Sequence, residues 1–273
     1  MTCLKVSESA ALPSFARSAL VIGHPGHELR VYGWLASALP QVFVLTDGSG
    51  TSGIGRLTST LEVLSRVGAP TVQTFPVFSD AGIYQAVLNS DITSFTTIVD
   101  ELADRFVRDE IELVASDANE GFNPTHDLCR EITYATVEKV RKLTGRIVPH
   151  YEFCLTEWEQ RSQLTHDDRC IHTSLSDIML AQKIDASRTY KELRGEVEEA
   201  LAFGSSEYFR VECLKRVVDW AATDSCKPQY EIWGEQRVAE GKYKFVLRFR
   251  EHILPIFLAL RTHVDATIAD SHK

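Results

Sequence analysis

The chain has 273 residues, of which 44% are hydrophobic and 25% are charged, and this composition excludes a disordered, collagenous or coiled-coil protein. Its 29 lysine and arginine residues against 38 aspartate and glutamate residues give a formal net charge of −9, and a field of that sign repels nucleic acid. The longest apolar runs, such as 253–260, are far shorter than the roughly 20 residues that span a bilayer. We therefore expect a globular protein with neither a membrane span nor a nucleic-acid partner.

The cysteines indicate the compartment in which the chain works. Six of them are scattered through the sequence, and no two stand at the CxxC spacing. In a chain of this size that distribution is more typical of a reducing cytoplasm than of a disulfide framework. The N-terminal region carries Glu8 and lacks the long apolar segment of a secretory signal. We therefore expect a cytoplasmic protein with free thiols at Cys3, Cys129, Cys154, Cys170, Cys213 and Cys226.

The first 150 residues alternate between short β-rich runs and longer amphipathic runs. This alternation is typical of βαβ units around a parallel sheet. The fold class that we predict is α/β, a Rossmann-like doubly wound and mostly parallel sheet with functional loops at the carboxyl ends of its strands. The predicted strands are 18–23, 41–46, 70–78, 111–116 and 146–153, and the predicted helices are 27–39, 56–67, 92–107 and 124–143.

The sequence changes character after about residue 155. A long charged stretch predicts a helix over 175–203, and a second helix is expected over 206–222. Apolar and aromatic residues at 230–234 and 243–250 predict a β-hairpin. We therefore divide the chain into a Rossmann-like core, 1–155, and a C-terminal extension, 156–273, whose helices and hairpin pack on the core and shape a pocket.

The pentapeptide HPGHE at 24–28 directly follows the first buried strand and leads into a helix. It places His24 at the strand end and His27 in the first turn of the helix, where side chains three positions apart converge. A second polar loop, 117–126, follows the fourth strand and ends in His126, and in doubly wound sheets such loops can lie side by side. The three histidines predict a zinc site that keeps a position open for water. The alternative is that each histidine caps a helix or hydrogen-bonds a loop.

Four motifs in a fixed order give the chain a resemblance to a known family. HPxxE at 24–28 follows the first strand, TDG at 46–48 follows the second, Arg56 begins the next helix, and NPTH at 123–126 follows the fourth strand. This order resembles the LmbE/PIG-L-like family of zinc-dependent N-acetylglucosaminyl deacetylases, which reads AHPDDE at the first loop and HPDH at the second. The resemblance covers roughly residues 17–150. It extends more weakly to 175–214, where a K-x-x-A-x-x-x-Y pattern is formed by Lys183, Ala186 and Tyr190.

The resemblance implies a metal-dependent hydrolase that deacetylates an N-acyl amino-sugar or a related small conjugate through a metal-bound water. His24 matches the first metal ligand of the family, and His126 matches the third. His27 stands where the family has a ligating aspartate, and imidazole suits Zn²⁺, or another divalent metal, as well as carboxylate does.

The chain departs from the family at the residues that act on the water and on the oxyanion. The resemblance assigns the general base that activates the water to an aspartate of the family, and Gly26 stands at that position. A glycine has no side chain that could accept a proton. Asn123 and Thr125 replace a histidine and an aspartate that help to stabilise the oxyanion, although an asparagine can still donate a hydrogen bond to it. The candidate catalytic residues are therefore Asp47, Asp117 and Asn123, with Glu120 and Asp127 as further candidate bases. Each of these acids could instead be a solvated loop residue, and we expect Glu28 to make a structural hydrogen bond.

Two interpretations of function stay open at this point, beside a third in which the chain is a nucleotide-dependent enzyme that uses the loop 48–53. One is the hydrolase, and the alternative is a non-catalytic sugar- or metabolite-binding pseudoenzyme on the same fold, because the base position is Gly26. Arg56 is the candidate substrate-binding residue for an anionic group, or else a solvated helix residue. A GxGxxG pattern at 48–53 would indicate a nucleotide site if it followed the first strand. It follows the second, so a flexible loop beside the pocket is the simpler interpretation.

Two other clusters need an interpretation. His166-Asp167-Asp168 with His172 resembles a set of metal ligands, but charged residues mostly lie on surfaces, and we expect a surface loop. The run FVLRF at 245–249 falls in the predicted hairpin. It either buries one face of that hairpin or forms a contact in a homo-oligomer.

Overall fold

The computed structural model describes residues 17–50, 52–71, 73–156, 170–203, 206–222 and 227–270. The strands of this part form a seven-stranded sheet with the order β3-β2-β1-β4-β5-β7-β6. The first five strands along that order run parallel, whereas β7 is antiparallel to both β5 and β6. The strands are β1 (Ser18–Ile22), β2 (Gln41–Thr46), β3 (Gln73–Phe78), β4 (Leu113–Asp117), β5 (His150–Phe153), β6 (Cys170–Ser174) and β7 (Val211–Arg216).

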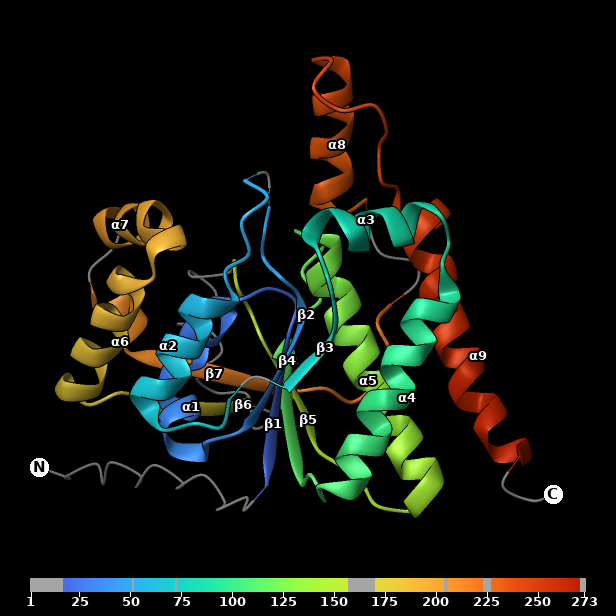
Figure 1. The fold of residues 1–273 in the computed structure, drawn as a ribbon, viewed down its shortest axis with the longest axis horizontal. Helices are drawn as coiled ribbons and strands as arrows, with labels where there is room; N and C mark the ends of the chain where they lie inside the picture. The colour runs from blue at the N-terminus through green and yellow to red at the C-terminus, as the bar shows by residue number, and fades with distance from the viewer. Residues whose placement is uncertain are drawn as a thin grey trace, which may run out of the picture.

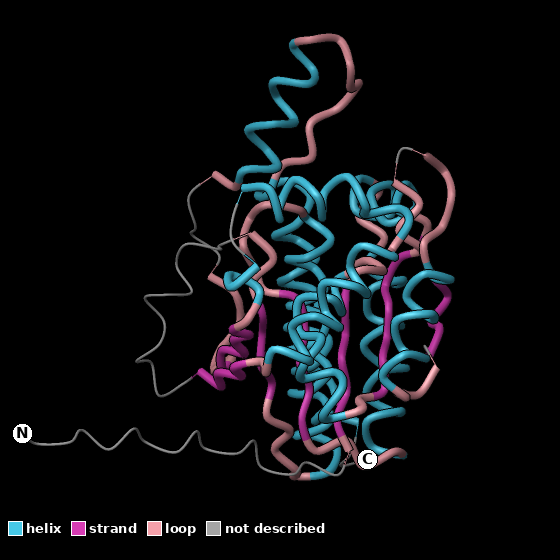
Figure 2. The backbone as a smooth tube through the Cα atoms, turned by 90° about the vertical axis from the view of Figure 1, so that its left-hand side faces the viewer, coloured by secondary structure: helices cyan, strands magenta, loops and turns pink. Residues whose placement is uncertain are grey.

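Helices cover both faces of the sheet, and Figure 1 shows α4, α5 and α9 on one side and α1, α2 and α6 on the other. Figure 2, turned by 90°, shows the strands running through the middle of the molecule and α8 projecting from it. The α-helices are α1 (Tyr32–Ala38), α2 (Leu57–Val67), α3 (Asp80–Leu88), α4 (Ile92–Arg108), α5 (Pro124–Thr144), α6 (Asp177–Thr189), α7 (Arg194–Phe203), α8 (Gln229–Ala239) and α9 (Leu254–Asp270). The shorter helical segments are η1 (His27–Val31), η4 (Lys191–Leu193), η5 (Ser206–Phe209) and η6 (Phe249–Ile253).

The two faces of the sheet bury two separate hydrophobic clusters. Every residue of β1 is buried, because a parallel strand with helices on both faces has no solvent-facing side. Side chains alternate along the strand, so Ala19 and Val21 enter the cluster that α4, α5 and α9 complete, whereas Leu20 and Ile22 enter the cluster of α1 and α2. The predicted α/β, doubly wound and mostly parallel fold is confirmed.

The strands and helices predicted for the first half of the chain form, but some of them begin or end at other residues than predicted. β3 begins at Gln73 rather than at 70, and β5 begins at His150 rather than at 146. The predicted helix 27–39 is a 3₁₀ turn, η1, followed by α1, which ends at Ala38; the C-cap residue Leu39 has the left-handed conformation (φ 45°). The helix α3 was not predicted; Ser79 caps it by accepting the backbone N–H of Gly82.

Three predictions for the C-terminal half were wrong. The single helix 175–203 is divided into α6, η4 and α7, because the backbone turns extended at Tyr190 (ψ 98°). The predicted helix 206–222 instead contains η5 and the strand β7. The hairpin does not form, since 230–234 lies inside α8 and the second half of FVLRF leads into the π-helical segment η6. Aromatic and β-branched residues favour strands only weakly, and tertiary packing overrides that preference here.

The helix α9 was missed, although it completes one face of the core. Ile256, Phe257, Leu260 and Val264 recur at helical spacing and are almost fully buried, so the apolar run 253–260 leads into a packed helix of which these residues form the buried face. Pro255 is the second residue of α9 and directly follows the π-helical segment η6. Among the described residues, no helix combines the length and the apolar character that crossing a membrane requires.

The C-terminal half also contributes to the central sheet. β7 pairs with β5, and β6 pairs with β7, so strands from both sides of residue 155 share one sheet. The division of the chain at 155 stays a prediction, as does an oligomer contact at 245–249. His166, Asp167, Asp168, Cys3 and Cys226 lie outside the described residues, and Cys129 is a buried free thiol.

Candidate functional site

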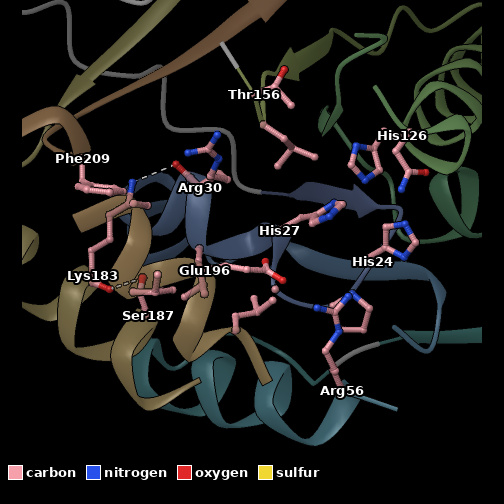
Figure 3. Close-up of a pocket in the computed structure, with 18 of the residues that line it drawn as sticks. His24, His27, Arg30, Arg56, His126, Thr156, Lys183, Ser187, Glu196 and Phe209 are labelled. Carbon is pink, nitrogen blue, oxygen red and sulfur yellow. Dashed lines mark hydrogen bonds between the residues drawn. The ribbon is translucent and has the colours of Figure 1, made fainter. Parts of the chain in front are cut away.

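Three histidines from separate segments meet at the carboxyl edge of the sheet. His24 follows β1, His27 opens η1, and His126 lies in the first turn of α5, after the loop that follows β4. The ring centroid of His24 lies 5.3 Å from the centroid of His27 and 5.3 Å from that of His126, and the centroids of His27 and His126 are 4.6 Å apart. Figure 3 shows the three rings grouped along one wall of a pocket. The side-by-side placement of the two loops follows from β1 and β4 being neighbours in the sheet.

The hydrogen bonds of His24 fix which of its nitrogens carries the proton. Its Nδ1 lies 2.8 Å from the hydroxyl of Thr46 and 3.1 Å from a carboxylate oxygen of Asp80. The Thr46 hydroxyl itself donates to the carbonyl of Gly23, and a carboxylate only accepts, so Nδ1 must be the donor. The lone pair therefore lies on Nε2, which is buried and has no hydrogen-bond partner among the described residues.

Asp80 is held in its ionised form beside His24. Burial works to raise its pKa, but the hydrogen bonds from His24 and from the Gly50 N–H outweigh that effect, so the pKa of Asp80 lies well below its usual range. The Gly50 N–H donates to the second carboxylate oxygen at 2.8 Å. Asp80 thus joins the loop after β2 to the imidazole after β1.

Asp117 performs the same task for His27. Its two carboxylate oxygens lie 3.0 and 2.9 Å from Nδ1 of His27, and the Gly23 N–H donates to one of them at 2.8 Å. The proton of His27 therefore lies on Nδ1, and the lone pair lies on Nε2. Asp117 is fully buried, and that burial raises its pKa to about 6. Burial also lowers the pKa values of His27 and His126 well below their usual range, so both imidazoles are neutral near pH 7.

The N-terminus of α5 positions His126. Asn123 caps the helix by accepting the Thr125 N–H at 2.8 Å, and Pro124 occupies the first turn, where its missing N–H costs nothing. His126 is buried, and its Nδ1 has no hydrogen-bond partner among the residues that the structure describes. Because the cap uses the side-chain carbonyl of Asn123, its amide NH₂ is the part that can donate to another group.

The donor set fits a zinc ion. Neutral imidazoles whose other nitrogen is fixed by a carboxylate are the usual form of metal-binding histidine. Three imidazoles on one tetrahedral Zn²⁺ at about 2.0–2.1 Å would place their ring centroids roughly 5 Å apart, close to the observed 4.6–5.3 Å. Their ligand nitrogens are farther apart than the ligand atoms of Cys170, His172 and Cys213, which all lie within 4.8 Å of one another in the described part of the chain. Binding one ion would therefore require small rotations of these rings.

The histidines border a cavity of about 720 Å³ that α6 and α7 help to enclose, a volume within the usual range for small-molecule sites. Figure 3 shows Arg56 and Glu196 reaching into the pocket from the side opposite His126. Apolar side chains of α6, α7 and the second loop provide much of the remaining wall. The residues that carry polar side chains at this wall include Arg30, Arg56, Asp80, Asn123, Lys183 and Glu196.

Arg56 reaches the pocket because the preceding loop makes room for it. A Cβ at Gly48 would lie 2.7 Å from Nε of Arg56, and Gly48 has a φ of +66°, which side-chain-bearing residues rarely adopt. The Nε of Arg56 is buried and has no hydrogen-bond partner among the described residues. The first glycine of the GxGxxG pattern thus accommodates the arginine, and the pattern follows β2 rather than β1.

The acids proposed as bases mostly organise loops. Asp47 accepts the backbone N–H groups of Ser49 and Asp80. Glu120 accepts those of Leu155 and Thr156, and Asp127 accepts those of Glu120 and Gly121. Among the described residues that line the cavity is Asn123, whereas Asp47 and Asp117 do not line it. The catalytic roles of Asp47, Asp117 and Asn123 stay predictions, and the geometry favours Asn123.

Gly26 occupies a crowded position. Its φ is +105°, and a Cβ there would lie 2.5 Å from Cδ1 of Leu193 and 3.5 Å from the Tyr190 ring. An aspartate at this position would require Leu193 to move. Glu28 accepts the Gly26 N–H at 2.7 Å and is fully buried, which raises its pKa to about 7. Glu28 thus makes the structural hydrogen bond expected of it.

Two acids of the site were missed. Asp80 lies two positions after the end of β3. A position just after a strand was the signal that singled out Asp47, and the same signal could have found Asp80. Glu196 lies on α7, which follows the K-x-x-A-x-x-x-Y pattern and is not part of it. The sequence gives no local indication that this helix borders the cavity.

No protein-family model matches the chain, and no curated protein matches its sequence. Its fold is similar to that of a deacetylase from the biosynthesis pathway of teicoplanin, solved as a bog complex, at 14% identity and a TM-score of 0.54. It is also similar to the zinc-inhibited form of teicoplanin deacetylase Orf2 (12%, 0.52) and to the A40926 pseudoaglycone deacetylase Dbv21 (16%, 0.52). Each alignment covers 77% of this chain and 100% of the other. At these identities the likeness shows a shared fold.

Proposed function

We propose that the chain is a zinc-dependent hydrolase that removes the acyl group from an N-acyl amino-sugar or a related small conjugate. The observation that carries the proposal is the convergence of His24, His27 and His126 on the wall of one cavity, with carboxylates fixing two of the rings. The similar solved structures support the deacetylase part of the proposal, because their names describe deacetylases. The one that is named a zinc-inhibited form supports zinc binding on this fold.

In this proposal His24, His27 and His126 hold the metal, and the surrounding acids keep them in place. Asp80 and Asp117 accept the Nδ1 protons of His24 and His27, which leaves each Nε2 lone pair available. A bound Zn²⁺ would supply Lewis-acid polarisation of the amide carbonyl and a more acidic water. Asp117 acts through His27 and is a positioning residue.

The remaining roles belong to residues that face the substrate. The amide NH₂ of Asn123 donates to the carbonyl oxygen as negative charge develops there. Arg56, whose Nε is buried without a partner among the described residues, binds an anionic group of the substrate. Of the two carboxylates that the described residues place on the cavity wall, Asp80 is committed to His24 and Gly50. We therefore assign the proton-accepting role to Glu196.

The test is amine release from N-acyl amino-sugars by the zinc-loaded protein. We expect turnover of at least one substrate in a broad panel and its loss in His24→Ala. A wild-type protein that binds zinc stoichiometrically and hydrolyses nothing would contradict the hydrolase.

The crowding at Gly26 favours a second candidate, a sugar- or metabolite-binding protein without catalysis. Leu193 occupies the space into which an aspartate base would extend. This alternative predicts that calorimetry detects saturable binding of an N-acetyl sugar while no amine is released. Measurable turnover that depends on His24 would exclude it.

A further inference from the structure

A second group of metal-ligating side chains lies on the outer two strands of the sheet, away from the pocket histidines. Cys170 and His172 belong to β6, and Cys213 belongs to β7. One ligand atom from each of the three lies within 4.8 Å of the other two. None of the three lines the cavity, as the described residues outline it.

The strand register explains why these side chains meet. His172 is paired directly with Cys213, and Cys170 with Lys215, in an antiparallel ladder. Directly paired residues project to the same face, and so does a residue two positions along the strand. Ile171 and Leu214 alternate with them and pack in the cluster shared with α1 and α6. The two cysteines and the histidine are therefore presented together on the opposite face.

We infer that Cys170, His172 and Cys213 form a second zinc site. Two thiolates and an imidazole suit a borderline-soft ion such as Zn²⁺ and are poor ligands for Mg²⁺ or Ca²⁺. Cys213 is buried and the other two are half-buried, so an ion there is partly shielded from solvent. These three ligands from the described residues leave a fourth tetrahedral position for water or another ligand.

This site would fasten the edge strand to the rest of the sheet. β6 has a neighbour on one side, β7, and an ion joining Cys170 and His172 to Cys213 would cross-link the two strands. The residue before Cys213 is Glu212, which accepts the backbone N–H groups of Gly33 and Trp34 and the ammonium of Lys183. Because Lys183 lines the cavity, zinc on the outer strands would also stabilise one wall of the pocket.

Cobalt titration of the reduced full-length protein tests this site independently of activity. Co²⁺ bound by thiolates gives a near-ultraviolet charge-transfer band, which a site made of imidazoles does not give. We expect the band to saturate at about one Co²⁺ per chain and to disappear when Zn²⁺ displaces it. It should be lost in Cys170→Ser and in Cys213→Ser and weakened in His172→Ala.

Two control proteins separate this site from general effects and from the pocket. Cys129→Ala removes a thiol elsewhere, and the combined His24→Ala, His27→Ala and His126→Ala variant removes the pocket histidines; both should keep the band. The inference is overturned if the wild-type protein shows no thiolate band, or if the band persists without Cys170 and Cys213. Mass spectrometry that finds these two cysteines joined in a disulfide in the metal-loaded protein would overturn it as well.

Discussion

Asp117 lies 2.9 Å from Nδ1 of His27 and accepts the backbone N–H of Gly23 at 2.8 Å. One buried acid at the end of β4 therefore fixes both the end of β1 and the imidazole that follows it. This arrangement links the sheet order, in which β1 and β4 are neighbours, to the orientation of a proposed metal ligand.

Replacing Asp117 with asparagine should weaken zinc binding in the pocket. The amide can still accept the Gly23 N–H, but it no longer holds the Nδ1 proton of His27 as a carboxylate does. Losing such an outer partner typically lowers metal affinity about 10- to 100-fold, and zinc competition with a chromophoric chelator measures this change. Asp185→Asn is the control, because Asp185 is exposed and pairs with Arg66 at the surface. Equal zinc affinity in Asp117→Asn and wild type would contradict the positioning role.

The proton-accepting role of Glu196 predicts a specific loss of turnover. Glu196→Gln keeps the shape of the side chain and removes the base, so kcat should fall about 100-fold or more, whereas zinc content should not change. Glu199→Gln, on the same helix and exposed, should leave kcat unchanged. A kcat for Glu196→Gln within a factor of about two of wild type would remove Glu196 from the mechanism.

The buried carboxyl of Asp127 should make the metal-free protein less stable as the pH rises. Burial raises its pKa to about 7, so the native state keeps a proton that the unfolded state releases near pH 4. The stabilisation is complete below about pH 4 and is lost as the pH rises to about 7. Glu28 and Asp117, with raised pKa values, contribute in the same direction.

Urea denaturation at several pH values between about 4 and 7 checks this linkage. Asp127→Asn can still accept the Glu120 and Gly121 N–H groups, but it does not titrate, so its free energy of unfolding should depend less on pH. Asp185→Asn should follow wild type. If Asp127→Asn keeps the full wild-type slope, Asp127 does not carry the raised pKa.

The helix α9 offers a test of the fold beyond the motifs. Phe257 is 0% exposed and packs against Phe249, whereas its neighbour Leu258 is 47% exposed. Phe257→Ala should lower the free energy of unfolding by about 3–5 kcal/mol, and Leu258→Ala by about 0.5 kcal/mol or less. Equal effects in urea denaturation would show that α9 does not pack as described.

The sequence predicted the parts of the fold in which one local pattern dominates. Parallel strands such as β1 and β2 are continuous apolar runs because both faces are buried, and His24 and His27 stand out because they directly follow such a strand. His126 could be added because the loops after the first and fourth strands lie side by side in doubly wound sheets.

Other features depend on partners that are distant in the sequence. The segment of β7 was predicted as helix. As a strand it buries Glu212, whose carboxylate accepts the ammonium of Lys183 and backbone N–H groups of α1. Glu196 reaches the pocket because the chain turns at Tyr190 and folds α7 over the cavity. The meeting of Cys170, His172 and Cys213 depends on the β6–β7 register, which the sequence does not reveal because Cys213 lies 41 and 43 positions after the other two residues.

The central claim is that the pocket histidines hold zinc, and elemental analysis of two matched proteins tests it most directly. Both carry Cys170→Ser and Cys213→Ser, so that the outer site cannot contribute, and one of them also carries His24→Ala, His27→Ala and His126→Ala. We predict about one zinc per chain in the first protein and none in the second. Equal zinc content in the two proteins, whether about one ion or none, would contradict the claim.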